Sequence, residues 1–257
     1  MTDAIDIRLF PARSDNFGVL VHVPATGATI SIDAPQEAPI LAALDAAGWR
    51  LTHILTTHHH NDHVEANEAL KSRFGAEIVG PAGERDRIPG IDRAVAGGER
   101  IEVGGLAFGV IDVPGHTLGH VAYHAPDAKA LFAGDALFSL GCGRIFEGTP
   151  EMLWASLQRL RTLPDDTMLY CGHEYTATNA RFASEVDPAN LMLHERIREV
   201  EGLRTAGWPT IPVELGREKL TNPFLRADDP DLAAAFGMTG AEPAAIFTAL
   251  RQKRDRF

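Results

Sequence analysis

The stretch Thr57-His58-His59-His60-Asn61-Asp62-His63 follows directly on an apolar run and dominates the chemistry of this chain. Four imidazoles and one carboxylate occupy its last six positions. Imidazole nitrogen and carboxylate oxygen are the ligands that hold zinc, iron and manganese in proteins. Alternation along an extended chain points His58 and His60 the same way, while Asp62 and His63 can turn toward a neighbouring point. The stretch therefore predicts two metal ions side by side.

Three further candidate ligands, His116, Asp135 and His173, each follow a strand-like run. The steps from His63 onward are 53, 19 and 38 residues. Such distances bring the ligands together only if the strands lie side by side with their ends along one edge. The simplest partition gives one ion His58, His60 and His116, gives the other ion Asp62, His63 and His173, and makes Asp135 the bridge between them.

This constellation predicts a hydrolytic centre. A water held between two metal ions ~3.5–4 Å apart loses a proton near neutral pH and becomes a nucleophile. We expect Asp62 and Asp135 to act in catalysis, since both lower the net charge of the centre and Asp62 can orient the hydroxide. Any one of these histidines alone would more often be an ordinary surface or core residue. Seven of the eleven histidines lie within these motifs or close to them, which a random scatter would rarely produce; they are His58, His59, His60, His63, His116, His120 and His173.

The remaining histidines and both cysteines are not expected to bind metal. His59 and His120 are expected to be supporting groups or plain neighbours of the ligands. The other four are expected to be ordinary core or surface residues, namely His22, His53, His124 and His194. Cys142 and Cys171 lie near the motifs, but seven ligands already fill two metal shells.

Local patterns predict an α/β segment followed by a helical one. Strands are expected at 19–23, 29–32, 51–57, 101–103, 106–113, 121–124, 130–132 and 167–171, with a two-glycine hairpin turn at 104–105. Helices are expected at 40–44 before Gly48, at 64–74 before Gly75, and at 150–160 behind the N-cap Thr149. After His173 the apolar spacing becomes helical. We therefore expect a metal-bearing domain at 1–173 and a helical domain at 174–257.

Composition limits the cellular setting and the partners. The 257 residues carry a net charge of -11, which argues against nucleic-acid binding and against anionic membranes. No run approaches the ~18 apolar residues of a membrane span. The segment Met1–Asp6 lacks the features of a signal or transit peptide, so we expect a cytoplasmic protein with two free thiols. We also expect a monomer.

The motifs resemble those of the metallo-β-lactamase superfamily, and within it those of hydroxyacylglutathione hydrolase, also called glyoxalase II. The resemblance rests on the motifs at 56–63, 114–120, 132–135, 141–144, 170–176, 221–226 and 251–257. It covers essentially the whole chain. It implies an αββα sandwich with a C-terminal, mostly helical domain and two divalent ions, zinc before iron or manganese. It also implies hydrolysis of S-D-lactoylglutathione to D-lactate and glutathione in methylglyoxal detoxification.

The resemblance also implies a set of glutathione contacts, at Arg144, Phe146, Tyr175, Asn179, Arg251 and Arg254. Arg144 and Phe146 depart from the lysine and tyrosine of animal members, and the second change removes one hydroxyl contact. The residues support part of this set, because Pro243 at a helix start places Arg251 and Arg254 on one helical face, and guanidinium groups bind carboxylates with two hydrogen bonds. These arginines could instead form a solvated basic helix end that offsets the helix dipole.

Four other functions compete with this interpretation. A persulfide dioxygenase of the same superfamily, with one iron, shares the motif at 141–144 but should lack the Gly172-His173-Glu174-Tyr175 pattern and the basic terminal helix. A secreted β-lactamase would need a signal peptide. A non-catalytic binding protein would not require a bridging carboxylate. A nuclease is disfavoured by the acidic net charge.

Overall fold

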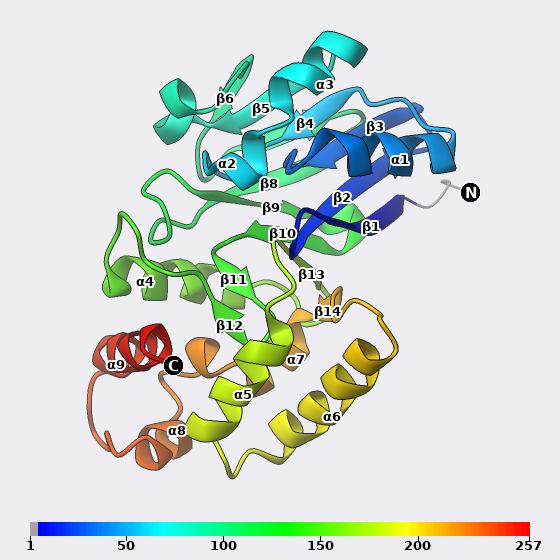
Figure 1. Ribbon diagram of the computed structural model, residues 1–257. Helices are drawn as coiled ribbons and strands as arrows, with labels where there is room; N and C mark the ends of the chain where they lie inside the picture. Colours follow the sequence, from blue (N-terminus) through cyan, green and yellow to red (C-terminus); the bar gives the residue numbers. More distant parts are fainter. Residues whose placement is uncertain (1–4) are drawn as a thin grey trace. The chain divides into compact units, whose positions relative to one another are not determined.

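The computed structural model describes residues 5–257, so most of the segment Met1–Asp6, expected to lack a targeting signal, lies outside the described residues. The chain forms two compact units, shown with their elements in Figure 1. Unit 1 comprises Met1–Asp112 and Gly119–Gly134, and unit 2 comprises Val113–Leu118 and Asp135–Phe257. Among the described residues, no helix is both long enough and apolar enough to cross a membrane.

Unit 1 contains a six-stranded mixed sheet whose strands follow one another in chain order. The first two strand pairs in the sheet are antiparallel, and the other three pairs are parallel. The strands are β1 (Asp6–Ala12), β2 (Asn16–Val23), β3 (Ala28–Ile32), β4 (His53–Leu55), β5 (Glu77–Pro81) and β6 (Arg93–Val95). The connections carry α1 (Glu37–Ala47), α2 (Asn61–Val64), α3 (Asn67–Phe74) and the 3₁₀ helix η1 (Ala82–Arg87).

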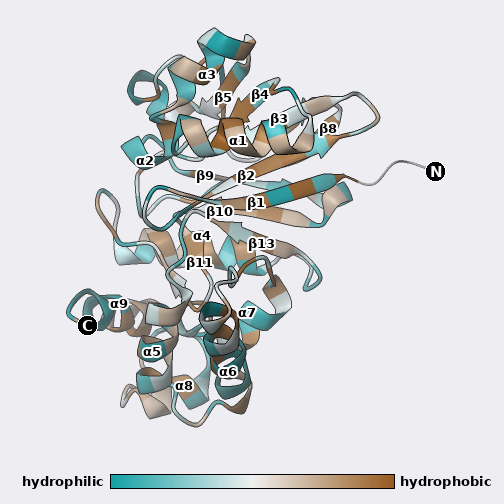
Figure 2. Cartoon of the chain, turned by 45° about the vertical axis from the view of Figure 1, so that its right-hand side comes forward, coloured by the Kyte–Doolittle hydropathy of each residue, from teal (hydrophilic) through white to brown (hydrophobic). Residues whose placement is uncertain are grey.

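The helices cover one face of this sheet because their apolar side chains pack on its strands. Ile40 and Leu44 of α1 and Leu70 of α3 share a buried cluster with Ile54 and Ile78 of the central strands. Figure 2 shows the hydrophobic residues along the strands and hydrophilic residues on α3. Burial of these apolar side chains between the helices and the sheet holds the two layers together.

A second, antiparallel sheet completes unit 1. Its strands in chain order are β7 (Arg100–Val103), β8 (Leu106–Asp112), β9 (Val121–Ala125) and β10 (Ala130–Gly134), with η2 (Pro126–Ala128) between the last two. The predicted hairpin turn is confirmed, because Gly104 and Gly105 adopt φ values of 60° and 86°. Only residues that tolerate positive φ fit such a turn, which makes glycine the favoured residue at both positions.

One hydrogen bond joins the second sheet to the end of β4. Tyr123 of β9 is fully buried, and its hydroxyl donates to the carbonyl of Thr56 at 2.8 Å. Its ring packs edge-on against Phe108 of β8. Thr56 lies two residues before His58, so the core between the sheets supports the start of the histidine run.

The predicted helix at 64–74 is interrupted, and the reason is tertiary. Two helices, α2 and α3, replace it, and Ala66 between them has φ −91° and ψ 1°. The amide of Ala66 donates to the carbonyl of Ala34, and the amide of Ala34 donates to the carbonyl of His63. These bonds to the segment after β3 replace helical ones, which the apolar spacing alone did not reveal.

Unit 2 is mostly helical, as predicted for the part after His173. It begins with two short hairpin strands, β11 (Leu137–Phe138) and β12 (Gly141–Cys142), and a second antiparallel pair, β13 (Met168–Cys171) and β14 (Val213–Glu214). Its helices are α4 (Pro150–Arg161), α5 (Thr176–Val186), α6 (Leu191–Thr205), α7 (Leu215–Thr221), η3 (Pro223–Leu225), α8 (Pro230–Ala235) and α9 (Pro243–Asp255).

Two predicted helix starts in unit 2 are confirmed. The Thr149 hydroxyl accepts a hydrogen bond from the Met152 amide at 3.3 Å, so Thr149 is the N-cap of α4. Pro243 occupies the first turn of α9, where its missing N–H has no intrahelical partner to lose.

The expectation that the ligand-bearing strands lie along one edge of a single sheet is wrong. β4, which precedes the histidine run, belongs to the six-stranded sheet, whereas β8 and β10 belong to the antiparallel sheet. The chain leaves the parallel strands after β6 and starts a new sheet at β7. The spacing between the candidate ligands indicates that strands lie between them, but it does not indicate which sheet each strand joins.

We predict that Tyr123→Phe lowers the free energy of unfolding by about 1–3 kcal/mol, because the buried carbonyl of Thr56 loses its donor. Equilibrium urea unfolding of the two proteins measures this difference. Equal stability of variant and wild type would contradict a role for this bond in joining the sheets.

Candidate functional site

The histidine run lies on the extended segment between β4 and α2. His58 is fully buried and His60 is half-buried. The Nε2 atom of His58 and the Nδ1 atom of His60 lie 3.1 Å apart. Two nitrogens that bind one zinc ion at ~2.0–2.1 Å in tetrahedral geometry lie about 3.3 Å apart. The spacing of this pair therefore fits two ligands of one ion.

Asp33 supports the run from the end of β3, a role that the sequence analysis missed. Its buried carboxylate accepts hydrogen bonds from the Thr57 amide at 2.7 Å, the Thr57 hydroxyl at 2.9 Å and Nδ1 of His63 at 2.8 Å. With Nδ1 donating to Asp33, Nε2 is the nitrogen of His63 that can bind a metal. Histidine ligands in metalloproteins are typically held in this way. A polar residue directly after a buried strand was the only signal in the sequence.

Asp62 and His59 are also held by neighbours within unit 1. The side-chain amide of Asn16 donates to the Asp62 carboxylate at 2.9 Å. His59 donates to the buried carboxylate of Glu84 from its backbone amide at 2.6 Å, and its ring Nδ1 lies 2.7 Å from the same oxygen. Glu84, another residue that the sequence analysis missed, thus orients the histidine segment through His59.

The candidate ligands of unit 2 gather around one carboxylate oxygen. Oδ2 of Asp135 lies 3.6 Å from Nε2 of His116 and 3.3 Å from Nε2 of His173. Nδ1 of His116 donates to the backbone carbonyl of Arg144 at 2.7 Å, which directs Nε2 toward Asp135. All three ligand side chains are buried.

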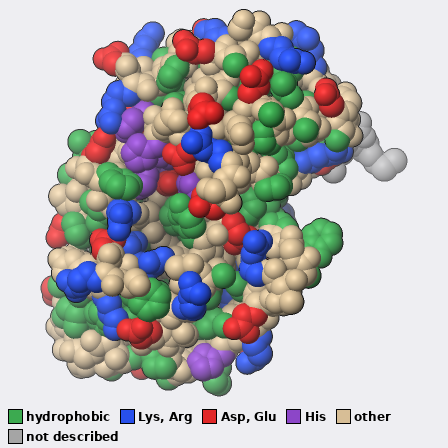
Figure 3. Space-filling model, viewed as in Figure 1, with side chains coloured by type: hydrophobic (Ala, Val, Ile, Leu, Met, Phe, Trp, Pro, Cys, Tyr) green, Lys and Arg blue, Asp and Glu red, His purple; other side chains and the backbone are tan. Residues whose placement is uncertain are grey.

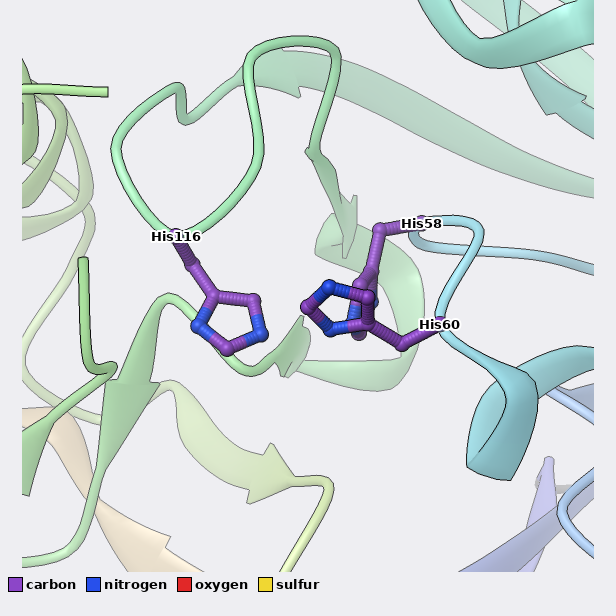
Figure 4. A group of neighbouring side chains, drawn as sticks. All are labelled: His58, His60 and His116. Carbon is purple, nitrogen blue, oxygen red and sulfur yellow. The ribbon is translucent and has the colours of Figure 1, made fainter. Parts of the chain in front are cut away.

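Three groups of side chains have donor atoms that lie within 4.8 Å of one another, as a metal site requires. The groups are His58, His60 and His116; Asp62, His63 and His173; and His58, His63 and Asp135. Figure 4 shows the first of them. Imidazole and carboxylate donors of this kind suit zinc, iron or manganese. Clusters of this kind support a dinuclear site for divalent metal ions.

The cysteines do not have the character of metal ligands. Both are free and buried. Burial raises the pKa of the Cys142 thiol to about 11 and that of the Cys171 thiol to about 12. Neither cysteine belongs to the three groups of donor atoms described above.

The aromatic residues of the predicted glutathione set lie beside two of the histidines of unit 2. The ring of Tyr175 stacks on His173, with centroids 4.7 Å apart and planes at 7°. Phe146 is 60% exposed, and its ring meets His116 edge-on at 5.2 Å. Both rings thus form apolar surface next to side chains that can bind metal.

The polar members of the set differ in how their groups are engaged. Arg144 is largely exposed, and its Nε lies 3.5 Å from Asp255. Arg254 is half-buried and donates to the Asn179 side-chain oxygen at 3.3 Å. Arg251 is buried and donates to the backbone carbonyls of Cys142 and Gly143. Figure 3 shows Lys and Arg side chains gathered over the region of α9 and α5.

Two family models match the chain, one after the other. The metallo-beta-lactamase superfamily matches residues 26–173, and the hydroxyacylglutathione hydrolase C-terminus matches residues 174–257. The hydroxyacylglutathione hydrolase of Rhizobium meliloti (strain 1021) is 56% identical over 254 residues, which cover 99% of both chains.

Solved structures support the fold. The BLEG-1 B3 metallo-beta-lactamase is 21% identical with a TM-score of 0.66, over 86% of this chain and 99% of that one. TTHA1623, solved in a di-iron-bound form, is 26% identical with a TM-score of 0.59, over 82% of this chain and 95% of that one. The predicted metallo-β-lactamase-like fold with a C-terminal helical part is confirmed.

The resemblance inferred from the motifs is thus confirmed by matches that together extend from residue 26 to the end of the chain. The chain belongs to the hydroxyacylglutathione hydrolase family of the metallo-β-lactamase superfamily.

Proposed function

We propose that this enzyme hydrolyses S-(2-hydroxyacyl)glutathione, with S-D-lactoylglutathione as the main substrate, to the 2-hydroxy acid and glutathione. The observation that carries the proposal is the 56% identity to a hydroxyacylglutathione hydrolase over 99% of both chains. In this proposal residues 1–173 supply the metal centre, and residues 174–257 recognise glutathione together with Arg144 and Phe146. The reaction would remove the thioester formed from methylglyoxal.

The proposed metal ligands are divided between two ions, zinc before iron or manganese. His58, His60 and His116 would hold one ion, and Asp62, His63 and His173 the other. The 3.6 Å and 3.3 Å distances from Oδ2 of Asp135 to Nε2 of His116 and of His173 support Asp135 as the bridge, because the proposed division assigns these two histidines to different ions. When bound, the ions would activate a water molecule and polarise the thioester carbonyl. Asn16 holds the Asp62 carboxylate, so that Asp62 can orient the attacking water.

The substrate would be held by unit 2. The apolar faces of Tyr175 and Phe146 would flank the acyl group and the sulfur beside His173 and His116. Arg144 and Arg254 would bind carboxylates of glutathione, with Asn179 as a polar contact and Arg251 both as a cation and as a support for Cys142 and Gly143. The leaving thiol has a pKa of ~8.5, far below that of an amine, so departure needs no dedicated general acid.

We also propose a monomer that acts in the cytoplasm. Cys142 and Cys171 are both free, and a reducing compartment keeps thiols in that form. Neither cysteine has a role in the proposed reaction.

The proposed function predicts about two divalent ions per chain and metal-dependent hydrolysis of S-D-lactoylglutathione. Elemental analysis of the purified protein measures the ions, and release of free thiol measures the rate. Removal of metal by a chelator should abolish hydrolysis, and added zinc should restore it. Full activity of a metal-free protein would disprove the proposed mechanism, and a metal-loaded protein inactive on the thioester would disprove the substrate assignment.

Replacement of Asp33 by asparagine should weaken metal binding about 10- to 100-fold, because an amide holds the His63 ring and the Thr57 backbone less firmly than a carboxylate. Competition for zinc with a chromogenic chelator gives the affinity. Asp45→Asn, on the exposed face of α1, is the matched control. Equal affinities for both variants would exclude Asp33 as the support of His63.

Arg254→Ala should raise KM for the thioester about tenfold and leave kcat within roughly twofold, since it removes a charged hydrogen bond made equally in ground state and transition state. Steady-state kinetics separate the two constants. Lys253→Ala removes the same charge from the neighbouring position, where the lysine pairs with Glu185 instead. A KM increase of equal size in both variants would show that general charge, not Arg254, accounts for the effect.

A further inference from the structure

We propose that Glu218, on α7, is a positioning residue for the metal ligands and the substrate-binding side chains of unit 2. It would act by holding the β11–β12 hairpin. Asp135 and Arg144 lie just before and just after this hairpin. The inference rests on the proposed function for its kinetic consequences, but its effect on metal binding stands apart from the choice of substrate.

The hairpin cannot hold its own shape. β11 and β12 each contain two residues, paired as Leu137 with Cys142 and Phe138 with Gly141. Two strands of this length are not stable in isolation. The turn between them also places Leu140 at φ 57°, a left-handed conformation that residues other than glycine rarely adopt. Surrounding groups must therefore impose this conformation.

Glu218 contacts the turn of the hairpin directly. Its side chain is fully buried, and Oε1 accepts from the Ser139 hydroxyl at 2.6 Å. Oε2 accepts from the Leu140 amide at 2.8 Å and from the Asn222 side chain at 3.1 Å. Arg196, also buried, donates to the same Ser139 hydroxyl at 3.2 Å. Burial raises the pKa of Glu218, while the three donors and the nearby charge of Arg196 act in the opposite direction. A buried carboxylate with three donors is costly to leave unsatisfied, so it strongly prefers this one arrangement.

Asn222, one helical turn after Glu218, forms hydrogen bonds to both strands of the hairpin. Its side-chain amide donates to the Phe138 carbonyl of β11 at 3.1 Å and to the Gly141 carbonyl of β12 at 3.0 Å. Because the same amide also contacts Glu218, the carboxylate orients the group that holds both strands. The turn and both strands thus depend on α7.

The hairpin in turn carries groups next to the metal ligands. Asp135 lies two residues before β11, and the ring of Phe138 meets those of His173 and Tyr175 edge-on at 6.0 and 5.3 Å. Arg144 lies two residues after β12, and its carbonyl accepts from Nδ1 of His116. A shift of the hairpin would therefore alter the direction of His116 and the position of Asp135.

The arrangement is more specific than packing requires. Leu140 already contributes to an apolar cluster with Ala180, Ala183 and Leu193, which anchors the turn without any buried charge. A buried carboxylate costs desolvation that an apolar residue avoids. Its directional bonds, however, set the backbone at Leu140 and the amide of Asn222, which apolar contacts cannot do.

The test is Glu218→Gln, which keeps the size of the side chain but turns one acceptor into a donor facing other donors. Zinc affinity, from competition with a chromogenic chelator, should fall about tenfold for the weaker site, as expected when the support of a ligand is disturbed. KM for the thioester should rise roughly three- to tenfold. Ser139→Ala removes one of the three donors and should change both constants in the same direction by less, which keeps the test open if Glu218→Gln does not fold.

Two control variants separate positioning from general stability. Glu195→Gln makes the same exchange on the exposed face of α6 and should change nothing. Val200→Ala removes buried apolar volume from α6 and should lower the melting temperature with zinc affinity and KM intact. If Glu218→Gln behaves like Val200→Ala, with lower melting temperature alone, the positioning role is wrong. If zinc affinity falls but the wild type does not hydrolyse the thioester, the positioning role holds and the proposed substrate is wrong.

Discussion

The site depends on one constraint: each histidine ligand must present one nitrogen in a set direction, and the partner of its other nitrogen decides that direction. The carboxylate of Asp33 does this for His63, and the backbone carbonyl of Arg144 does it for His116. Both histidines are buried, so water does not compete for these bonds. These two rings are therefore held in one orientation, which would lower the cost of binding a metal ion.

Two residues that support the site have a positive φ, a backbone conformation that is rare for residues other than glycine. Among the described residues other than glycine, Arg13, Asp33, Lys129 and Leu140 have positive φ. Two of these four belong to the supports of the site: Asp33 bonds to the histidine run, and Leu140 forms the turn of the hairpin before Arg144. Such conformations cost roughly 1–2 kcal/mol each and persist where surrounding contacts impose them. The network of hydrogen bonds around each of the two residues provides those contacts.

Features that depend on neighbours along the chain were predictable from sequence. The Gly104–Gly105 turn, the Thr149 cap and the Pro243 helix start follow from local backbone preferences. The candidate metal ligands could be recognised because so many imidazoles fall within short motifs.

Features that depend on distant partners were not predictable. Asp33 lies 30 residues from His63, and Ser139 lies 79 residues from Glu218. Nothing near either carboxylate in sequence indicates its partner. The break between α2 and α3 and the division of the ligand-bearing strands over two sheets were missed for the same reason, because each depends on contacts that form only in the folded chain.

The cations of α9 are the groups that we propose for recognition of an anionic substrate by this acidic protein. With a net charge of -11, the protein repels a glutathione thioester at long range, so attraction must arise locally. Asp255 lies 2.9 Å from Arg251 and 3.5 Å from Arg144, and it offsets part of their charge. Arg254 instead donates to the neutral amide of Asn179. Burial and the nearby charge of Arg251 lower the pKa of Arg254, which means that its charged form is poorly solvated where it lies. A carboxylate that approaches Arg254 would replace the missing solvation, and the gain in free energy is therefore greater there than at an arginine already paired with an acid.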